Sequence, residues 1–112
     1  MATTYNRNNR TEHAWIDHAA RMILIEEYLG FTNIVVEVID KRKDGRIARK
    51  GLTSSGVIVI RYLSEDKIIT AYMARDYQAR EICRKAGKKC VPPKLMEKVR
   101  KNAKRHPELF YA

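Results

Sequence analysis

Residues 56–73 read GVIVIRYLSEDKIITAYM and decide the fold, because they hold two short apolar runs separated by a polar tip. Both runs, 56–63 and 67–73, are dense in the β-branched and aromatic residues that suit the pleated surface of a sheet. They predict two antiparallel strands with Ser64, Glu65 and Asp66 at the hairpin tip. Because helical patterns lie on both sides of this hairpin, the chain is expected to have an α+β fold.

The hairpin places three side chains on one face if its loop is centred on residues 65–66. In that register Arg61 lies opposite Thr70, and Val59 lies opposite Tyr72. Residues directly opposite each other share a face of the sheet. Arg61, Thr70 and Tyr72 are therefore expected to emerge together, where a cation, a hydroxyl and an aromatic ring suit a phosphate and a stacked base. An ordinary amphipathic strand carries a similar pattern.

The segments before the hairpin predict a helix, an ambiguous element and a turn. Apolar residues recur at helical spacing from Thr11 to Leu29, and Gly30 is a typical residue for a helix end. Residues 31–40 are apolar and β-branched, so a second helix and a strand both stay open. The basic stretch 41–51 surrounds an Asp-Gly pair and favours a turn between two short extended pieces.

Two helices are predicted after the hairpin. Asp76 can cap the first, which continues to Ala86 and ends at Gly87. Pro93 suits the first position of the second, which reaches about His106. One side of that last helix is apolar and contains Leu95, Met96, Val99 and Ala103. The other side is a basic stripe at spacings of four, three and four residues, formed by Lys94, Lys98, Lys101 and Arg105.

A length of 112 residues is expected to form one domain over residues 11–112, preceded by a polar, flexible arm at residues 1–10. The helical extension within this domain covers residues 75–106. No apolar run approaches the roughly 20 residues that span a bilayer, and the N-terminus has no signal-peptide core, so a cytoplasmic location is expected. Cys83 and Cys90 have no zinc-type spacing, so no metal or cofactor is predicted, and two unpaired structural thiols are favoured over a disulfide.

The net charge of +10 is unevenly distributed along the chain. Residues 1–40 hold three basic and six acidic side chains, whereas residues 41–112 hold twenty basic and seven acidic ones. A solvated helix face normally carries both basic and acidic side chains, but the basic stripe places like charges where they repel. This pattern favours a polyanion as the binding partner, with RNA preferred. A membrane is disfavoured as a partner, because the basic segments lack an apolar interfacial face. The residues expected to contact nucleic acid are Lys41, Arg42, Lys43, Arg46, Arg49, Lys50, Arg84, Lys88, Lys94, Lys98, Lys101 and Arg105.

His18 and Arg21 lie three residues apart and are expected on the same side of the first helix. A histidine titrates near physiological pH and can exchange protons with a ribose hydroxyl, and a guanidinium can hold the phosphate. The alternative is a half-buried His18 that packs on the sheet, with Arg21 paired to Asp17. The residues alone favour this structural alternative.

Taken in order, these elements resemble the barnase, EndoU, colicin and RelE-like nuclease superfamily, especially its phage- or toxin-associated members. The resemblance rests on HisAlaAlaArgMet at residues 18–22, IleThrxTyr at residues 69–72 and the order of elements from about residue 12 to residue 75. It implies helices packed on a small curved antiparallel sheet and RNA cleavage without a metal. The C-terminal helices lie outside it.

The resemblance also implies roles for individual residues. His18 would be the general acid or base, and Arg21 and Arg61 would hold the scissile phosphate. Thr70 and Tyr72 would line the site. The second proton-transfer group stays open among Tyr72, His13 and a Lys of residues 41–50.

Three functions are compatible with these features. The leading hypothesis is a metal-independent ribonuclease, for which an acidic inhibitor, an antitoxin or a host protein is considered as a second partner. The alternative is a non-catalytic protein of a phage or mobile element that binds nucleic acid, a nucleotide signal or a host protein. A DNA-binding regulator with its last helix in a major groove ranks last, because Gly87–Pro93 is longer than the usual turn and contains two prolines.

Overall fold

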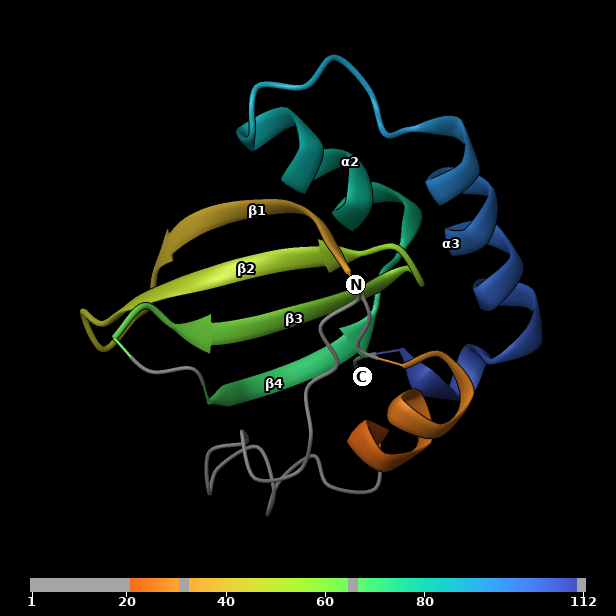
Figure 1. Ribbon diagram of the computed structural model, residues 1–112, viewed down its shortest axis with the longest axis horizontal. Helices are drawn as coiled ribbons and strands as arrows, with labels where there is room; N and C mark the ends of the chain where they lie inside the picture. Colours follow the sequence, from red (N-terminus) through yellow and green to blue (C-terminus); the bar gives the residue numbers. More distant parts are fainter. Residues whose placement is uncertain (1–20, 31–32, 65–66, 111–112) are drawn as a thin grey trace.

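Four consecutive strands form one antiparallel sheet and pair in the order in which they follow each other along the chain. The strands are β1 (Ile34–Lys41), β2 (Ile47–Thr53), β3 (Val57–Tyr62) and β4 (Ile68–Met73). This computed structural model describes residues 21–30, 33–64 and 67–110 (Figure 1). Residues 31–40 were open to helix or strand, and the eight residues from Ile34 form β1.

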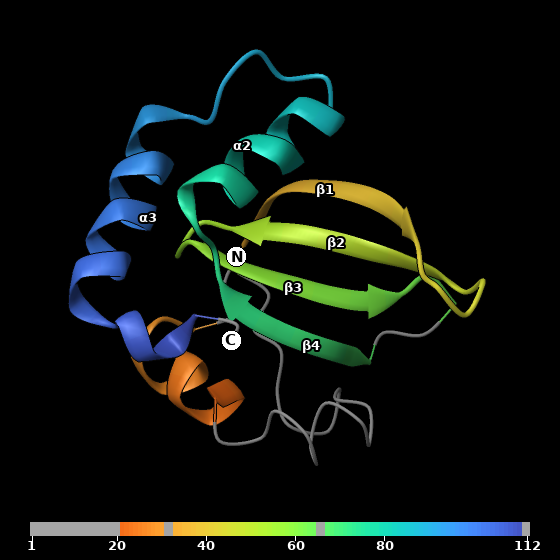
Figure 2. The same cartoon turned by 180° about the vertical axis from the view of Figure 1, so that it is seen from behind.

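Helices lie on both faces of this sheet. On one side are α2 (Asp76–Lys85) and α3 (Pro93–Arg105), and the helical residues 21–28 lie near the opposite side together with the short 3-10 helix η2 (Pro107–Leu109) (Figures 1 and 2). The α+β prediction is confirmed, and the sheet is open, with β1 and β4 as its edges. None of the helices in the described part of the chain has the length and apolar character needed to cross a membrane.

The larger core lies between the sheet and the two C-terminal helices. Ile58 and Tyr72 pair across β3 and β4 and face this core, where Ile82 of α2 and Val99 of α3 cover them. Burying one such aliphatic side chain contributes about 1.5–3 kcal/mol. The amphipathic pattern of α3 thus turns its apolar side inward and leaves its basic stripe at the surface.

A second core covers the opposite face of the sheet. Val59 and Ala71 pair on this side, and Met22 and Ile25 of the helical residues 21–28 pack over them together with Leu109. The first helix ends as predicted: Gly30 has a φ of 75°, and its amide N–H donates to the carbonyl of Ile25 at 2.9 Å. The predicted part of this helix before residue 21, like the arm at residues 1–10, lies outside the described residues.

The hairpin register differs from the predicted one by one residue. Thr70 pairs with Ile60, not Arg61, and Tyr72 pairs with Ile58, not Val59. The register then shifts, because the next pair is Arg61 with Ile68, so β4 contains one extra residue at this point. Such a bulge is set by local backbone geometry and by the loop, which residue composition alone does not mark.

One predicted cap is also corrected. The N-cap of α2 is Arg75, whose backbone N–H donates to Oε1 of Gln78 at 2.9 Å, and Asp76 is the first residue of the helix. This shift frees the Asp76 carboxylate for contacts with other side chains. The start of α3 at Pro93 agrees with the prediction, and Gly87 follows α2 with a φ of 82°.

Candidate functional site

The register shift separates two of the residues that were expected to form a catalytic cluster. Tyr72 is 7% exposed and faces the core beneath α2 and α3. Arg61 lies on the opposite face, is 8% exposed and donates from Nη2 to Oε2 of Glu37 at 3.1 Å. Because these side chains point to opposite sides of the sheet, the expected shared face of Arg61 and Tyr72 is wrong. His18, the expected proton-transfer group, lies outside the described residues.

Arg21 and Thr70 are brought together. The Arg21 side chain donates from Nη2 to Oγ1 of Thr70 and from Nε to the carbonyl of Ala71, both at 3.2 Å. Thr70 is 6% exposed, so its side of this contact is largely shielded from water. This contact joins the first helix to the edge strand β4.

The basic residues of the turn between β1 and β2 are set among carboxylates. The turn lines a hollow of about 810 Å³ that includes Asp40, Asp44 and Tyr62. The Arg46 guanidinium lies 3.6 Å above the centre of the Tyr62 ring, and the backbone N–H of Arg46 donates to Oδ1 of Asp44 at 2.9 Å. Lys41, Arg42 and Lys43 also line this hollow. Its mixed charges make it a weaker site for a polyanion than its sequence suggested.

Arg49 and Lys50 are neighbours in β2 and so point to opposite faces of the sheet. Lys50 is half-buried on the side of α2. The hydrogen bond and the charge of Lys85 lower the pKa of the Glu81 carboxyl most, and the charge of Lys50 lowers it further. Arg49 is opposite Arg61 on the other face and is also half-buried. Two of the expected nucleic-acid contacts are therefore separated from each other by the sheet.

The C-terminal segment carries the largest exposed charge. Residues 75–106 contain twelve basic and three acidic side chains, a net charge of +9, and all twelve basic residues are exposed. Only Arg80, Lys85 and Arg100 contact a carboxylate, and within the described residues the other nine form no ion pair. The predicted stripe is among these nine. We call this set the α2–α3 basic surface: Arg75, Arg80, Arg84, Lys85, Lys88, Lys89, Lys94, Lys98, Arg100, Lys101, Lys104 and Arg105.

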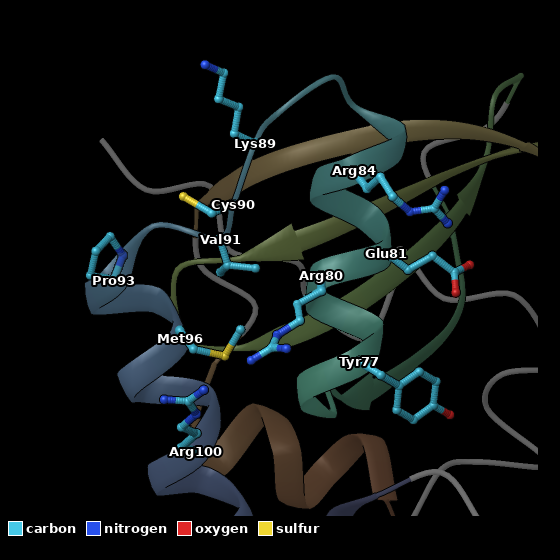
Figure 3. Close-up of a pocket in the computed structure, with 10 residues that line it drawn as sticks. All are labelled: Tyr77, Arg80, Glu81, Arg84, Lys89, Cys90, Val91, Pro93, Met96 and Arg100. Atoms are coloured by element: carbon cyan, nitrogen blue, oxygen red, sulfur yellow. The ribbon is translucent and has the colours of Figure 1, made fainter.

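A groove of about 770 Å³ runs along α2, α3 and the loop between them. In Figure 3 the Arg80 side chain extends from α2 toward Met96 of α3, and Arg100 lies on α3 beside them. Tyr77, Glu81 and Arg84 project from the other side of α2 (Figure 3). Val91 and Met96 are 6% and 9% exposed and provide apolar surface, while the guanidiniums stand at the rim. The groove thus combines an apolar floor with a cationic rim.

Asp76 connects the two helices through Arg80 and Arg100, which both line this groove. Its Oδ1 lies 2.8 Å from Nε of Arg80, and its Oδ2 lies 3.1 Å from Nε of Arg100. One carboxylate therefore holds two guanidiniums and leaves a net positive charge. Each guanidinium keeps both Nη groups as donors.

A second hollow of about 480 Å³ continues the surface along α3. Pro93 and Arg100 line both hollows, so the two adjoin at this helix. Lys101 and Arg105 of the predicted stripe line the second hollow together with Lys104 and one acidic residue, Glu97. A cationic path therefore extends from α2 across Arg100 and along α3.

Both cysteines are unpaired, as predicted. Cys83 is 1% exposed in the core, and burial raises the pKa of its thiol. Cys90 is exposed and lines the groove. The two thiols thus have different environments despite their closeness in sequence.

Sequence reasoning missed the arrangement of Asp76, Arg80 and Arg100. The i,i+4 spacing of Asp76 and Arg80 was a usable signal for an ion pair within a helix. Arg100 is 24 residues from Asp76, and only the packing of α3 beside α2 brings it near.

Comparison with protein-family models, with curated proteins and with solved structures found no match for this chain. The relationship to the nuclease superfamily therefore stays a prediction.

Proposed function

We propose that this protein binds RNA through the α2–α3 basic surface. The observation that supports the proposal best is the exposure of all twelve basic side chains of residues 75–106. Basic side chains that bind phosphates release condensed counterions from the nucleic acid, and this release supplies most of the affinity that does not depend on sequence. The proposed ligand is cytoplasmic RNA, and an acidic protein that imitates phosphates would compete for the same surface.

Arginine spacing along the two helices supports the choice of a phosphate ligand. Arg80 and Arg100 present planar guanidiniums that can bind phosphate oxygens in pairs, which a lysine cannot do, whereas Arg84 projects from the other side of α2 and contributes its charge (Figure 3). The lysines of α3 extend the same positive potential along the helix. An extended anion suits this surface better than a compact one, because the cationic path spans two adjoining hollows.

RNA cleavage is the second candidate function. The contact of Arg21 with Thr70 favours it, since the resemblance assigns both residues to one site. The burial of Arg61 and Tyr72 on opposite faces weighs against it, because a cleavage site needs cations and a proton-transfer group that converge on one phosphate. Binding without cleavage is therefore the proposed activity.

Labelled single-stranded RNA incubated with the protein in EDTA separates the two functions. The proposal predicts that RNA is shifted in a native gel and recovered intact. The variant with Lys94, Lys98, Lys101 and Arg105 all changed to Gln is expected to lose most of this shift. Fragments that appear with the natural protein and disappear with His18→Ala would establish the ribonuclease instead, and an absence of both shift and fragments would refute both functions.

A further inference from the structure

Arg80 and Arg100 form a pair of guanidiniums that share one carboxylate partner. Asp76 contacts Nε of each one, at 2.8 Å and 3.1 Å. The side chains of Arg80 and Arg100 remain 63% and 59% exposed, so the rest of each guanidinium is open to solvent. Within the described residues neither has another hydrogen-bond or ion-pair partner. Two sets of Nη donors thus stand side by side at the rim of one groove.

The interior of the groove has a different chemistry from its rim. Val91, Pro93 and Met96 line it, and Met96 lies beside the Arg80 side chain (Figure 3). Apolar surface adds nothing to the binding of a bare phosphate, but it suits the flat face of a nucleobase. Ligand pockets of small organic molecules have volumes of about 300–1,000 Å³, and the groove at about 770 Å³ lies within this range.

We infer that the groove binds one unpaired nucleotide of an RNA strand, with a phosphate on the Arg80 and Arg100 guanidiniums and the base against Met96 and Val91. This inference rests on the proposed function and adds a subsite and a substrate class to it. A base inside a double helix is paired and stacked, so its faces cannot enter such a groove, whereas single strands can expose them. The adjoining hollow along α3 would hold neighbouring phosphates.

Asp76 is then a positioning residue, and its role can be separated from that of net charge. Asp76→Asn removes one negative charge beside the groove, so a purely electrostatic surface would bind RNA more tightly. If Asp76 fixes the two guanidiniums, the same change weakens binding, because the arginines lose the contact that orients them. The two explanations therefore predict opposite signs.

The first experiment measures the dissociation constant of a short unstructured RNA by fluorescence anisotropy for Asp76→Asn and for Glu97→Gln. Glu97 is exposed on α3, forms no ion pair within the described residues and provides the matched change in charge. We expect Asp76→Asn to weaken RNA binding about 3- to 10-fold. Glu97→Gln is expected to strengthen RNA binding by no more than about 2-fold. Tighter binding by both variants would overturn the role of Asp76.

The second experiment keeps the net charge constant. Arg80→Lys is expected to weaken binding about 3- to 10-fold because lysine lacks Nε and the planar pair of Nη groups, whereas Arg84→Lys on the same helix is expected to stay within about 2-fold. A thermal melt checks that each variant is folded. If Asp76→Asn proves unstable, Arg80→Lys and Arg84→Lys decide the question, and equal affinities of these two would overturn the subsite.

The third measurement compares the single strand with a duplex of the same length. The single strand is expected to bind at least about 10-fold more tightly at the same salt concentration. Equal affinity for both, with strong binding retained, would refute the nucleotide groove and leave the proposed RNA binding intact. No binding of either nucleic acid would refute the proposed function itself.

Discussion

Asn102 of α3 donates a hydrogen bond from Nδ2 to the carbonyl oxygen of Ser55, 2.8 Å away. Asn102 is 3% exposed, so this bond joins the helix to the turn between β2 and β3 in a place without access to water. It was not predicted, because a buried asparagine within a basic helix gives no periodic signal. The bond helps to fix the position of α3, and with it the basic stripe, relative to the sheet.

Asn102→Ala is expected to destabilise the protein by about 1–3 kcal/mol, because the buried carbonyl of Ser55 loses its donor. Urea unfolding followed by circular dichroism measures this change. Asn33→Ala, at an exposed position before β1, serves as the control and is expected to stay within about 0.5 kcal/mol. Equal stability of the two variants would show that the Asn102 bond contributes nothing to the fold.

Gly56→Ala is expected to cost more stability than Gly87→Ala. Both glycines have a positive φ, at 85° and 82°, which costs an alanine about 1–2 kcal/mol. At Gly56 a Cβ atom would also lie 2.7 Å from Nδ2 of Asn102, whereas at Gly87 it meets no atom within 4 Å. The structural shift needed to relieve this clash destabilises the Gly56 variant by about 1–3 kcal/mol more, and the Gly87 variant has no such cost. Equal losses in thermal unfolding would contradict the close approach of α3 to this turn.

Alkylation is expected to distinguish the two thiols. Iodoacetamide at pH 8 should modify Cys90 rapidly, because this residue is exposed. Cys83 should react only after unfolding in urea, since burial excludes the reagent and raises the pKa of the thiol, which lowers the fraction of reactive thiolate. Peptide mass spectrometry measures both rates, and comparable labelling of the two cysteines in the native protein would contradict the packing of α2 on the sheet.

Arg61→Met tests whether Arg61 has a structural role. Its ion pair with Glu37 is largely buried on the arginine side, so removal of the cation is expected to destabilise the protein by about 2–3 kcal/mol, below the 3–5 kcal/mol of fully buried pairs because Glu37 is partly exposed. Urea unfolding measures the loss. The RNA affinity of the folded fraction is expected to remain within about 2-fold of the natural protein. A stable variant that loses RNA binding would place Arg61 in the ligand site.

The sequence predicted the hairpin, the turn around Asp44 and Gly45, and the limits of α2 and α3 to within a residue or two, because each depends on local chemistry. Alternating β-branched residues define β3 and β4, and Pro93 and Gly87 mark helix limits through their own backbone preferences. The basic stripe was also predicted correctly, since its exposure follows from the apolar residues on the other side of α3.

The site could be predicted only in part, because its geometry depends on contacts between distant residues. A bulge of one residue in β4 was enough to place Tyr72 in the core and Arg61 on the opposite face. The contact of Asp76 with Arg100 likewise depends on how α3 packs beside α2. Neither feature leaves a local pattern in the sequence, so both required the assembled fold.

The salt dependence of RNA binding tests the central claim most directly. The helix variant has Lys94, Lys98, Lys101 and Arg105 changed to Gln, and the turn variant removes four charges at Lys41, Arg42, Lys43 and Arg46. Each phosphate contact on a single strand contributes about 0.7 to the slope of log affinity against log salt. The helix variant is expected to lower the magnitude of this slope by about 2–3, and the turn variant by less than about 1. Equal slopes for the two variants, or RNA binding that does not depend on salt, would contradict an RNA-binding surface on α2 and α3.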